Sequence, residues 1–249
     1  MFVAASTECF PDLSLDGALS RLVDLEYSAV EIDIHEGGQH LKPSQVHENL
    51  EGAIGACRAT YRLNISAYSI DITAEGKLYY EQFASCCTLA KATKVVCLVI
   101  PSSELGTPFN AEIERLRDMV AIASREGVQL ALKTQAGRMT QDPDTAVVMC
   151  DQVKGLGLTL DPSHYVYGPQ GGVNYDQVLK HVLHVQLRDS TKDKFQVRVG
   201  QGVIEYGKLM SQLARYNYNR ALSANIVEMP DVDHAAELRK MRLLLESLL

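Results

Sequence analysis

Short apolar runs with a period of two residues alternate along the chain with longer runs of helical period. The short runs predict strands, because successive side chains of a strand point to opposite faces of a sheet. They lie at residues 2–5, 29–34, 63–69, 95–100, 128–133, 156–161, 182–187 and 221–227. The longer runs predict helices at residues 14–25, 43–61, 77–92, 111–126, 143–153, 175–180, 206–216 and 234–249. Strands that alternate with helices in this way favour parallel βαβ units.

Eight such units predict a single (β/α)8 TIM barrel of the α/β class rather than an open sheet. The 249 residues match the usual size of this fold, about 250 residues. No linker or low-complexity segment divides the chain, so one domain is expected over residues 1–249. The amphipathic run at 235–249 is expected to close the barrel against the first strand. A dimer contact, and therefore a homo-oligomer, is the alternative for this run.

Composition excludes several classes of protein. The net charge of −7 disfavours nucleic acid as a partner, because such binding needs a basic surface. No stretch approaches the roughly 20 apolar residues that span a bilayer, so no membrane partner is expected. Residues 1–10 lack a basic region followed by a long apolar run, which disfavours a signal peptide. The six cysteines form no CxxC pair and are predicted to be buried, reduced thiols. Together these features predict a cytoplasmic protein.

The segment 157–164 holds the first candidate chemistry, an acid and a histidine directly after a strand. In the strand, Gly157, Thr159 and Asp161 share one face, so the face with the acid also carries small side chains. Pro162 helps to end the strand, because it cannot donate a hydrogen bond to a neighbouring strand. Asp161 and His164 can bind a metal or move protons. The alternative is a capped turn in which Asp161 bonds the backbone near Ser163.

The strands on either side carry further polar residues in matching phase. The rule of alternation sends Lys133, Asp161, Gln186 and Asn225 to the same mouth of the barrel. A single polar residue at a strand end is usually part of a wet rim, but four from successive strands indicate a binding or catalytic site. His184 also points inward and is predicted to form hydrogen bonds in a lower layer.

The order of these residues resembles the xylose isomerase-like TIM barrel family, which comprises sugar phosphate isomerases and epimerases and has endonuclease IV as a relative. The family motifs place an acid at the end of strand five and Asp-x-x-His at the end of strand six. A His-x-Lys/Arg-Asp segment follows on strand seven and a glutamate on strand eight. The resemblance implies that the first acid, the Asp, the strand-seven His and the final Glu hold a divalent metal, Mn, Mg or Zn, which polarises the sugar.

This chain keeps only part of that pattern. Asp161-Pro162-Ser163-His164 is intact, and Leu187-Arg188-Asp189 follows on strand seven. The other metal positions read Lys133, Gln186 and Asn225, with Glu228 three residues beyond Asn225. The loop at 197–202 resembles a glycine-containing loop of the family whose arginine, here Arg198, can reach substrate.

The substitutions predict that the divalent metal does not bind, so no cofactor is expected. The matching positions carry one ammonium and one carboxylate, whose charges cancel, whereas hard cations prefer several anionic oxygens. A like charge at ~4 Å costs roughly 4 kcal/mol for each pair of unit charges at an effective dielectric constant near 20. Lys133 is expected to pair with Asp161 instead. The alternative is a displaced metal site formed by Asp161, His164, Asp189 or Glu228.

The first functional hypothesis is an isomerase or epimerase that acts on, or binds, a small carbohydrate or polyol. Lys133 would supply the electrophile, His164 would carry the proton, and Asp161 would orient it or act as the base. The expected substrate contacts are Glu31, Gln186, Arg188, Arg198 and Asn225. The alternative for Glu31, near Asp33 on strand two, is a salt bridge within the mouth.

The second hypothesis is a pseudoenzyme, a barrel without catalytic activity that binds a ligand or partner, since fold does not determine function. A DNA-repair nuclease is disfavoured by the acidic charge and the missing metal ligands.

His35, His40 and His47 have no ligand spacing on a firm helix and are expected at the surface.

Overall fold

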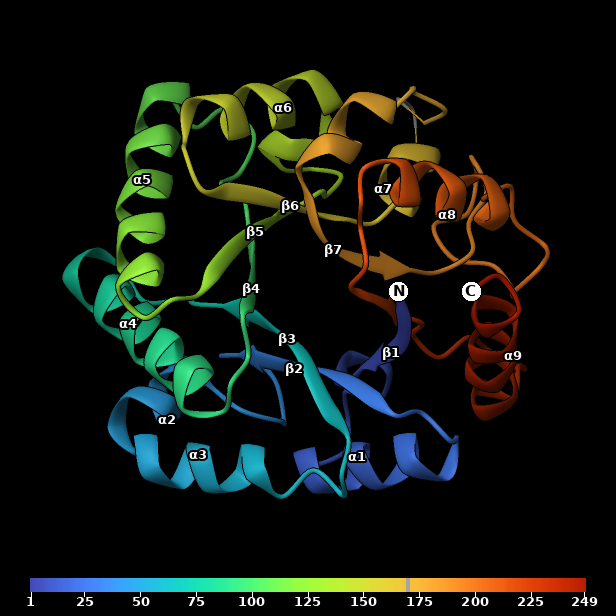
Figure 1. Cartoon of the computed structure of the whole chain (residues 1–249), viewed down its shortest axis with the longest axis horizontal. Helices are drawn as coiled ribbons and strands as arrows, with labels where there is room; N and C mark the ends of the chain where they lie inside the picture. Colours follow the sequence, from blue (N-terminus) through green and yellow to red (C-terminus); the bar gives the residue numbers. More distant parts are fainter. Residues whose placement is uncertain (169–170) are drawn as a thin grey trace.

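Eight parallel strands close into a barrel in the order of the sequence, as Figure 1 shows for the computed structural model, which describes residues 1–168 and 171–249. The strands are β1 (Phe2–Ser6), β2 (Ala29–His35), β3 (Asn64–Asp71), β4 (Cys97–Pro101), β5 (Gln129–Lys133), β6 (Leu156–Leu160), β7 (Val182–Leu187) and β8 (Ala221–Ala224). Pairing of β1 with β8, with Phe2 beside Ala221, closes the ring. The (β/α)8 TIM barrel expected from the sequence is confirmed.

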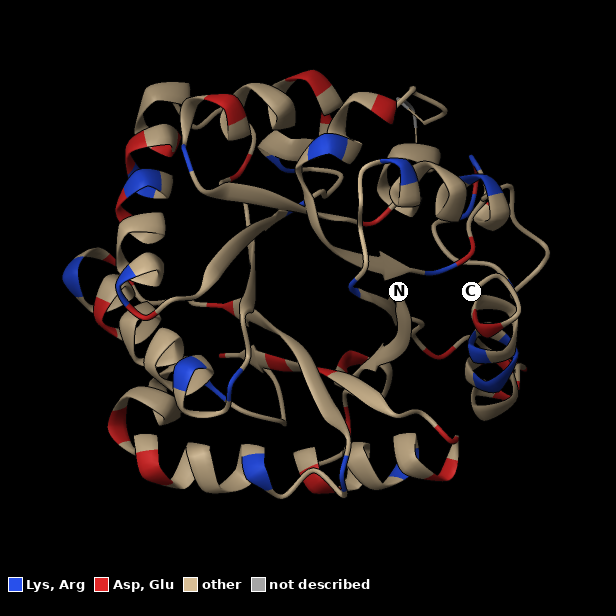
Figure 2. Ribbon diagram, in the orientation of Figure 1, with Lys and Arg blue, Asp and Glu red and all other residues tan. Residues whose placement is uncertain are grey.

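Helices surround the barrel and cover the outer faces of its strands (Figure 1). They are α1 (Leu15–Asp24), α2 (Pro43–Glu48), α3 (Leu50–Arg58), α4 (Gly76–Ala92), α5 (Phe109–Arg125), α6 (Pro143–Gln152), α7 (Ser163–Val166), α8 (Tyr206–Arg215) and α9 (His234–Glu246). The run at 175–180 forms a 3₁₀ helix, Asp176–His181. Figure 2 shows most charged residues on these outer elements and few on the strands, as expected for a core between sheet and helices.

Two local predictions from the sequence differ from the structure. The helix expected at 43–61 is two helices, because Asn49 leaves helical geometry and its side chain caps α3 by accepting a hydrogen bond from the Gly52 N–H at 3.0 Å. Asparagine is favoured at such a cap because its side-chain oxygen satisfies a free backbone N–H group. The sequence predicts no helix between residues 161 and 174, where the structure has the short helix α7; residues 169 and 170 lie outside the described part.

The C-terminal helix closes the barrel, as its apolar stripe predicts. Leu238, Met241 and Leu245 of α9 are buried in the core that lies between sheet and helices. The Tyr27 hydroxyl donates a hydrogen bond to the Leu238 carbonyl at 2.8 Å, which ties the helix to the segment before β2.

All six cysteines are buried and free. No helix within residues 1–168 and 171–249 is long and apolar enough to cross a membrane.

The inner face of β6 carries small residues because the barrel interior leaves little room there. A Cβ atom on Gly157 would collide with the side chain of Leu183 on β7. The face of β6 that leads to Asp161 at the mouth therefore carries glycine at position 157 and the small side chain of Thr159.

Candidate functional site

An arginine from β7 links the carboxyl ends of β6, β7 and β8. The Arg188 Nε lies 3.3 Å from Asp161 Oδ2, and the Arg188 Nη2 donates a hydrogen bond to Asn225 Oδ1 at 3.0 Å. The Asn225 amide in turn donates to Glu8 Oε2, after β1, at 2.8 Å. The guanidinium also lies over the Phe195 ring, 4.8 Å from its centroid. A cation belonging to the protein therefore occupies the space between Asp161 and Asn225.

The expected pair of Lys133 with Asp161 is absent from this network, and that prediction is wrong. Arg188 is 5% exposed, so its charge needs a buried partner, whereas the half-buried Lys133 can reach solvent. The Arg188 Nε–H is poorly aligned with Asp161 Oδ2, so their contact is an ion pair rather than a good hydrogen bond.

Asp161 also forms the capped turn that was the alternative interpretation of its segment. Its Oδ1 accepts a hydrogen bond from the Ser163 N–H at 3.0 Å and another from the Ser163 hydroxyl. Full burial raises the pKa of Asp161, but Arg188, His164 and Ser163 together lower this pKa below its usual value. The carboxylate is therefore ionised, with Oδ1 hydrogen-bonded to Ser163 and Oδ2 in an ion pair with Arg188.

His164 is held as a neutral ring beside Asp161. Its Nδ1 accepts a hydrogen bond from the Ala136 N–H at 3.1 Å, so the proton resides on Nε2, which lies 3.7 Å from Asp161 Oδ2. Burial lowers the pKa of His164 to about 4; Asp161 opposes this shift, and Lys133 and Arg188 add to it. The ring also packs on Phe195 with centroids 4.7 Å apart. Such a histidine can hold or pass a proton without a charge of its own at neutral pH.

Below this layer, Glu31 binds two side chains of β7. The Gln186 amide donates to Glu31 Oε1 at 2.6 Å, and His184 Nε2 lies 3.1 Å from Glu31 Oε2. Burial raises the pKa of Glu31, but the effects of His184 and its other neighbours outweigh burial and lower the pKa. The expected lower-layer role of His184 agrees with this arrangement, and Glu31 has the contact within the barrel that was its alternative interpretation. Gln186 and Glu31 are fully buried, so both lie beneath the open surface of the mouth.

On the other side of the mouth, Lys133 lines a cavity of about 200 Å³ together with Glu8, His35, Asp71 and Arg138. No carboxylate oxygen of the described residues lies within 4.0 Å of the Lys133 ammonium group. Burial raises the pKa of Glu8, but Lys133, Asn225 and Arg188 together lower it to about 2. The cavity therefore presents an ionised carboxylate and an ammonium that has no ion-pair partner in the described chain.

His35 belongs to this cavity and not to the outer surface, so its expected position is wrong. Its Nε2 lies 3.2 Å from the Ser69 hydroxyl and 4.0 Å from Asp33 Oδ1. The pKa of His35 is below its usual value, chiefly because the ring is buried. His40 is also partly buried, with Nε2 3.1 Å from the Phe10 carbonyl oxygen, whereas His47 is exposed as expected.

Asp33 is a buried acid with weak partners. Its Oδ1 accepts a hydrogen bond from the Ser6 hydroxyl at 3.4 Å. Burial, reinforced by the charges of Glu8 and Glu31, raises the pKa of Asp33 well above its usual value. Asp33 lines a neighbouring cavity of about 270 Å³, where a neutral carboxyl group can donate a hydrogen bond to a ligand.

Three candidate residues lie apart from the mouth. Arg198 is exposed, with its Nε 3.3 Å from Glu237 Oε1 on α9. Asp189 Oδ2 accepts hydrogen bonds from the N–H groups of Gly200 and Gly202 at 2.8 and 2.9 Å, so it orders the loop after β7. Glu228 is exposed, and Asn225 is the residue that β8 sends into the mouth.

This arrangement does not fit a divalent metal at the positions that the resemblance implies. Two of the groups around Asp161 are cationic, Lys133 and Arg188, and the guanidinium already fills the space beside the carboxylate. Of the further residues in the displaced alternative, Asp189 is bonded to the backbone of the loop after β7 and Glu228 is exposed. Among residues 1–168 and 171–249, no group of three or more His, Cys, Asp and Glu side chains is arranged to hold a metal ion.

Several residues of the mouth were missed in the sequence, although a signal was present. In the segment Glu31-Ile32-Asp33-Ile34-His35, polar and apolar residues alternate strictly, and Ser69 and Asp71 share a phase on β3. The rule that places Lys133 and Asp161 at the mouth also places Asp33, His35 and Asp71 there. Glu8 follows β1 in a short 3₁₀ turn, which alternation along the strand does not predict.

Comparison with known proteins agrees with the fold. The sequence model of the xylose isomerase-like TIM barrel family matches residues 19–247. No curated protein matches the sequence. Among solved structures, 3-keto-D-glucoside 4-epimerase YcjR from E. coli is 15% identical, with a TM-score of 0.75 and 99% of each chain covered.

An L-ribulose 3-epimerase is also 15% identical, with a TM-score of 0.71, covering 100% of this chain and 96% of that one. IOLI protein, solved with a binding zinc atom, is 15% identical with a TM-score of 0.74, covering 100% of this chain and 98% of that one. At these identities the structural likeness concerns the fold alone, whereas the family match extends over most of the sequence. The chain belongs to the xylose isomerase-like TIM barrel family.

Proposed function

We propose that this barrel binds a small carbohydrate or polyol at its carboxyl-terminal mouth and isomerises or epimerises it without a divalent metal. The observation that carries the proposal is the Lys133 ammonium group, which lines a cavity of about 200 Å³ without a carboxylate partner within 4.0 Å in the described chain. Sites for drug-sized ligands usually have volumes of about 300–1,000 Å³, so this cavity suits a smaller molecule. The polar side chains around Lys133 suit hydroxyl groups.

Lys133 has the charge needed to replace a metal as electrophile. Removal of a proton next to a carbonyl group develops negative charge on the carbonyl oxygen, and a fixed cation nearby stabilises that charge. His164 is the proposed proton carrier, because its ring is neutral: Nδ1 can take up a proton once the hydrogen bond from the Ala136 N–H opens, and Asp161 faces the Nε2–H. Asp161 is the positioning group for this ring. Gln186, Arg188 and Asn225 support the mouth from β7 and β8, and Glu31 from below.

The epimerases with similar folds support carbohydrate as the substrate class. The E. coli relative is described as a 3-keto-D-glucoside 4-epimerase, and another solved structure is a D-psicose 3-epimerase in the presence of D-fructose, 8% identical with a TM-score of 0.73. Their substrates motivate the ligands that we would test first.

A catalytically inactive binding protein is the second candidate, and one observation favours it. Asp161 and Glu31, the acids deepest in the mouth, are each already bonded by side chains of the protein. Neither has a free oxygen that faces solvent, so neither can remove a proton from a ligand without rearrangement.

Titration calorimetry with D-fructose and D-psicose, with EDTA and then with Mn²⁺, tests the proposed site. We expect binding that EDTA leaves unchanged and that Lys133→Met weakens about tenfold, a loss of roughly 1.4 kcal/mol. Lys154→Met, at an exposed position far from the mouth, is the control. Stoichiometric Mn²⁺ binding that Asp161→Asn abolishes would refute metal-free action.

Exchange of ligand protons in D₂O, followed by NMR, separates the two candidates. Deuterium at the carbon next to the carbonyl group, lost in Lys133→Met and His164→Asn, indicates catalysis. Binding without deuterium incorporation indicates the inactive alternative. An adduct on Lys133 after borohydride treatment would show that the lysine acts as a Schiff-base amine rather than as an ammonium group.

A further inference from the structure

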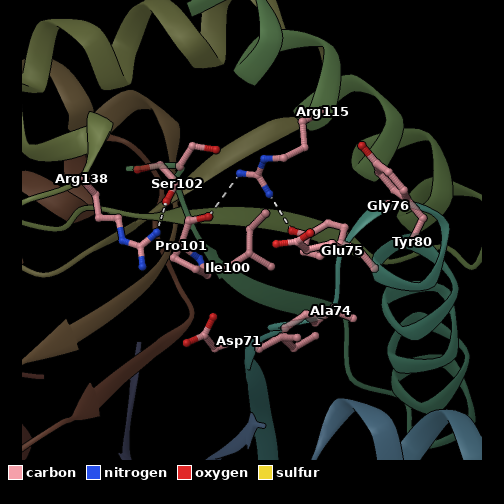
Figure 3. A pocket seen from close by; sticks show the side chains of 14 residues that line it. Asp71, Ala74, Glu75, Gly76, Tyr80, Ile100, Pro101, Ser102, Arg115 and Arg138 are labelled. Atoms are coloured by element: carbon pink, nitrogen blue, oxygen red, sulfur yellow. Dashed lines mark hydrogen bonds between the residues drawn. The ribbon is translucent and has the colours of Figure 1, made fainter. Parts of the chain in front are cut away.

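A larger cavity opens beside the mouth cavity, between the ends of β3 and β4 and the start of α4 (Figure 3). Its volume is about 390 Å³, compared with about 200 Å³ for the cavity at Lys133. The proposed function makes no use of this larger cavity, and a monosaccharide at Lys133 would leave it unfilled.

The two cavities share part of their lining. Ile70, Ile100 and Pro101 line both of them, as do Asp71 and Arg138, and no ion pair within 4.0 Å joins the two charged residues in the described chain. The Arg138 Nη1 instead donates to the Ser102 carbonyl at 3.1 Å, which holds the guanidinium at the edge (Figure 3). In Figure 3, Asp71 and Arg138 lie on one side of the cavity, with Gly76 and Tyr80 across from them. A ligand at Lys133 can therefore continue past Asp71 and Arg138.

The walls of the larger cavity suit a ring. Tyr79, Tyr80, Ile72, Ala74 and Pro101 provide apolar surface, and the two tyrosine rings meet edge to face with centroids 5.3 Å apart. A flat ligand can pack on such surface, while the carboxylates of Asp71 and Glu75 at the edge can accept hydrogen bonds from hydroxyl groups.

One wall is also held rigid. Arg115 makes two hydrogen bonds to the Glu112 carboxylate, at 2.7 and 2.8 Å, and a third to the Tyr79 hydroxyl at 2.6 Å. Because Glu112 neutralises Arg115, this arginine fixes the tyrosine rather than attracting an anion. A preformed wall lowers the entropy lost when a ligand binds.

We propose that the natural ligand is a carbohydrate with a second ring, either a reducing disaccharide or a glycoside whose first ring carries a keto group, and that its second ring occupies the cavity at Tyr79 and Tyr80. This inference rests on the proposed function, because the first ring is taken to lie at Lys133. The shared chemistry of the second ring is a flat, mainly apolar face with polar groups at its edge. An aryl group and a second sugar both meet that description.

Saturation-transfer NMR and titration calorimetry with matched methyl and phenyl glycosides, and with disaccharides, test the inference. We expect the phenyl glycoside or the disaccharide to bind about tenfold more tightly than the methyl glycoside of the same sugar. Ala74→Trp fills the larger cavity and should abolish this difference while the methyl glycoside binds as before. Tyr80→Ala removes one wall and should reduce the difference without adding bulk. Thr73→Trp, an exposed neighbour that does not line the cavity, is the control.

The outcomes separate the inference from the proposed function. Equal affinity for all ligands of one sugar, or equal losses for both kinds of ligand in Ala74→Trp, would overturn the second-ring site and leave the mouth site intact. Absence of binding by every mono- and two-ring carbohydrate would overturn both. A phenyl advantage without a disaccharide advantage assigns the cavity to an aryl group, and the reverse result assigns it to a second sugar.

Discussion

The two halves of the barrel mouth use their charges in opposite ways. On the side of β6 to β8, Asp161, Arg188 and Asn225 satisfy one another and are buried. On the side of β2 to β5, His35, Asp71 and Lys133 line cavities. The closed half holds three of the four positions that the family resemblance assigns to a metal, whereas Lys133, at the fourth, lines the open half. The difference shows how a barrel can fill one site with its own side chains and leave the adjacent one for a ligand.

Burial decides what each charge contributes. A buried ion pair stabilises only while both partners are present, because a lone buried charge has lost its hydration. A half-buried lysine beside a cavity costs little to remove, since water already solvates part of it. We therefore expect substitutions in the closed half to affect stability most, and those in the open half to affect ligand binding most.

Arg188→Met should have the largest effect on stability. It leaves Asp161 buried without a cation, at a cost of about 3–5 kcal/mol in the free energy of unfolding, measured by urea denaturation. Arg198→Met removes an exposed arginine from its pair with Glu237 and should cost less than about 1 kcal/mol. Adding Asp161→Asn to Arg188→Met should recover part of the loss. Equal effects of the two arginine substitutions would show that the halves do not differ in this way.

His164 should make stability depend on pH in the acid range. Its pKa is about 4 in the folded chain and near the usual value of about 6.5 in the unfolded chain, so the unfolded chain binds more protons between these values. Stability therefore rises with pH across this window, by about 3 kcal/mol at most. His164→Asn should flatten the rise, measured as urea midpoints from pH 4 to 7. The exposed His47→Asn is the control, and an unchanged slope in His164→Asn would contradict the prediction.

Asp33→Asn should stabilise the protein by about 1 kcal/mol at pH 7. The folded chain raises the pKa of Asp33, so the unfolded chain loses this proton first, and folding is penalised above the unfolded pKa. An amide removes the penalty, and the gain should shrink as pH falls toward 4. Thermal and urea unfolding at both pH values measure this gain. Asp71→Asn, at an exposed carboxylate, should show neither the gain nor its pH dependence.

Lys133→Met should have the smallest effect on stability, within about 0.5 kcal/mol, although it removes the proposed electrophile. The ammonium has no carboxylate within 4.0 Å in the described chain, so its removal weakens a longer-range attraction to Glu8, which keeps its direct hydrogen bond from Asn225. The free energies of unfolding of Lys133→Met and Arg188→Met, both measured by urea denaturation, give the most direct comparison of the two halves. A loss above about 2 kcal/mol would place Lys133 in the closed network.

Strand positions and the phase of side chains could be predicted from the sequence, because alternation along a strand is local. That rule placed Lys133, Asp161, Gln186 and Asn225 at one mouth; the structure has Lys133, Asp161 and Asn225 there and Gln186 in the layer below, bonded to Glu31. The partner of Asp161 could not be predicted in the same way, since it depends on side-chain length and burial across strands. Arg188 lies two residues beyond Gln186 and so shares its face, but only the assembled barrel shows that its guanidinium reaches both Asp161 and Asn225.

The break at Asn49 and the position of His35 illustrate two further limits. The helical period continues through Asn49, and the cap that separates α2 from α3 depends on the backbone conformation of this one residue, which the period does not report. Helical spacing does not report the position of His35, because this residue lies at the end of β2, in phase with Glu31 and Asp33.

The position of Arg188 also bears on the mutational paths open to this chain. Restoring single metal ligands, such as Gln186→His or Asn225→Glu, would bring no gain while the guanidinium stays between Asp161 and residue 225. Replacing Arg188 first would expose the chain to the largest loss of stability that we expect here. Because neither order of substitution is favourable step by step, the buried Arg188 opposes the gradual acquisition of a metal site in this chain.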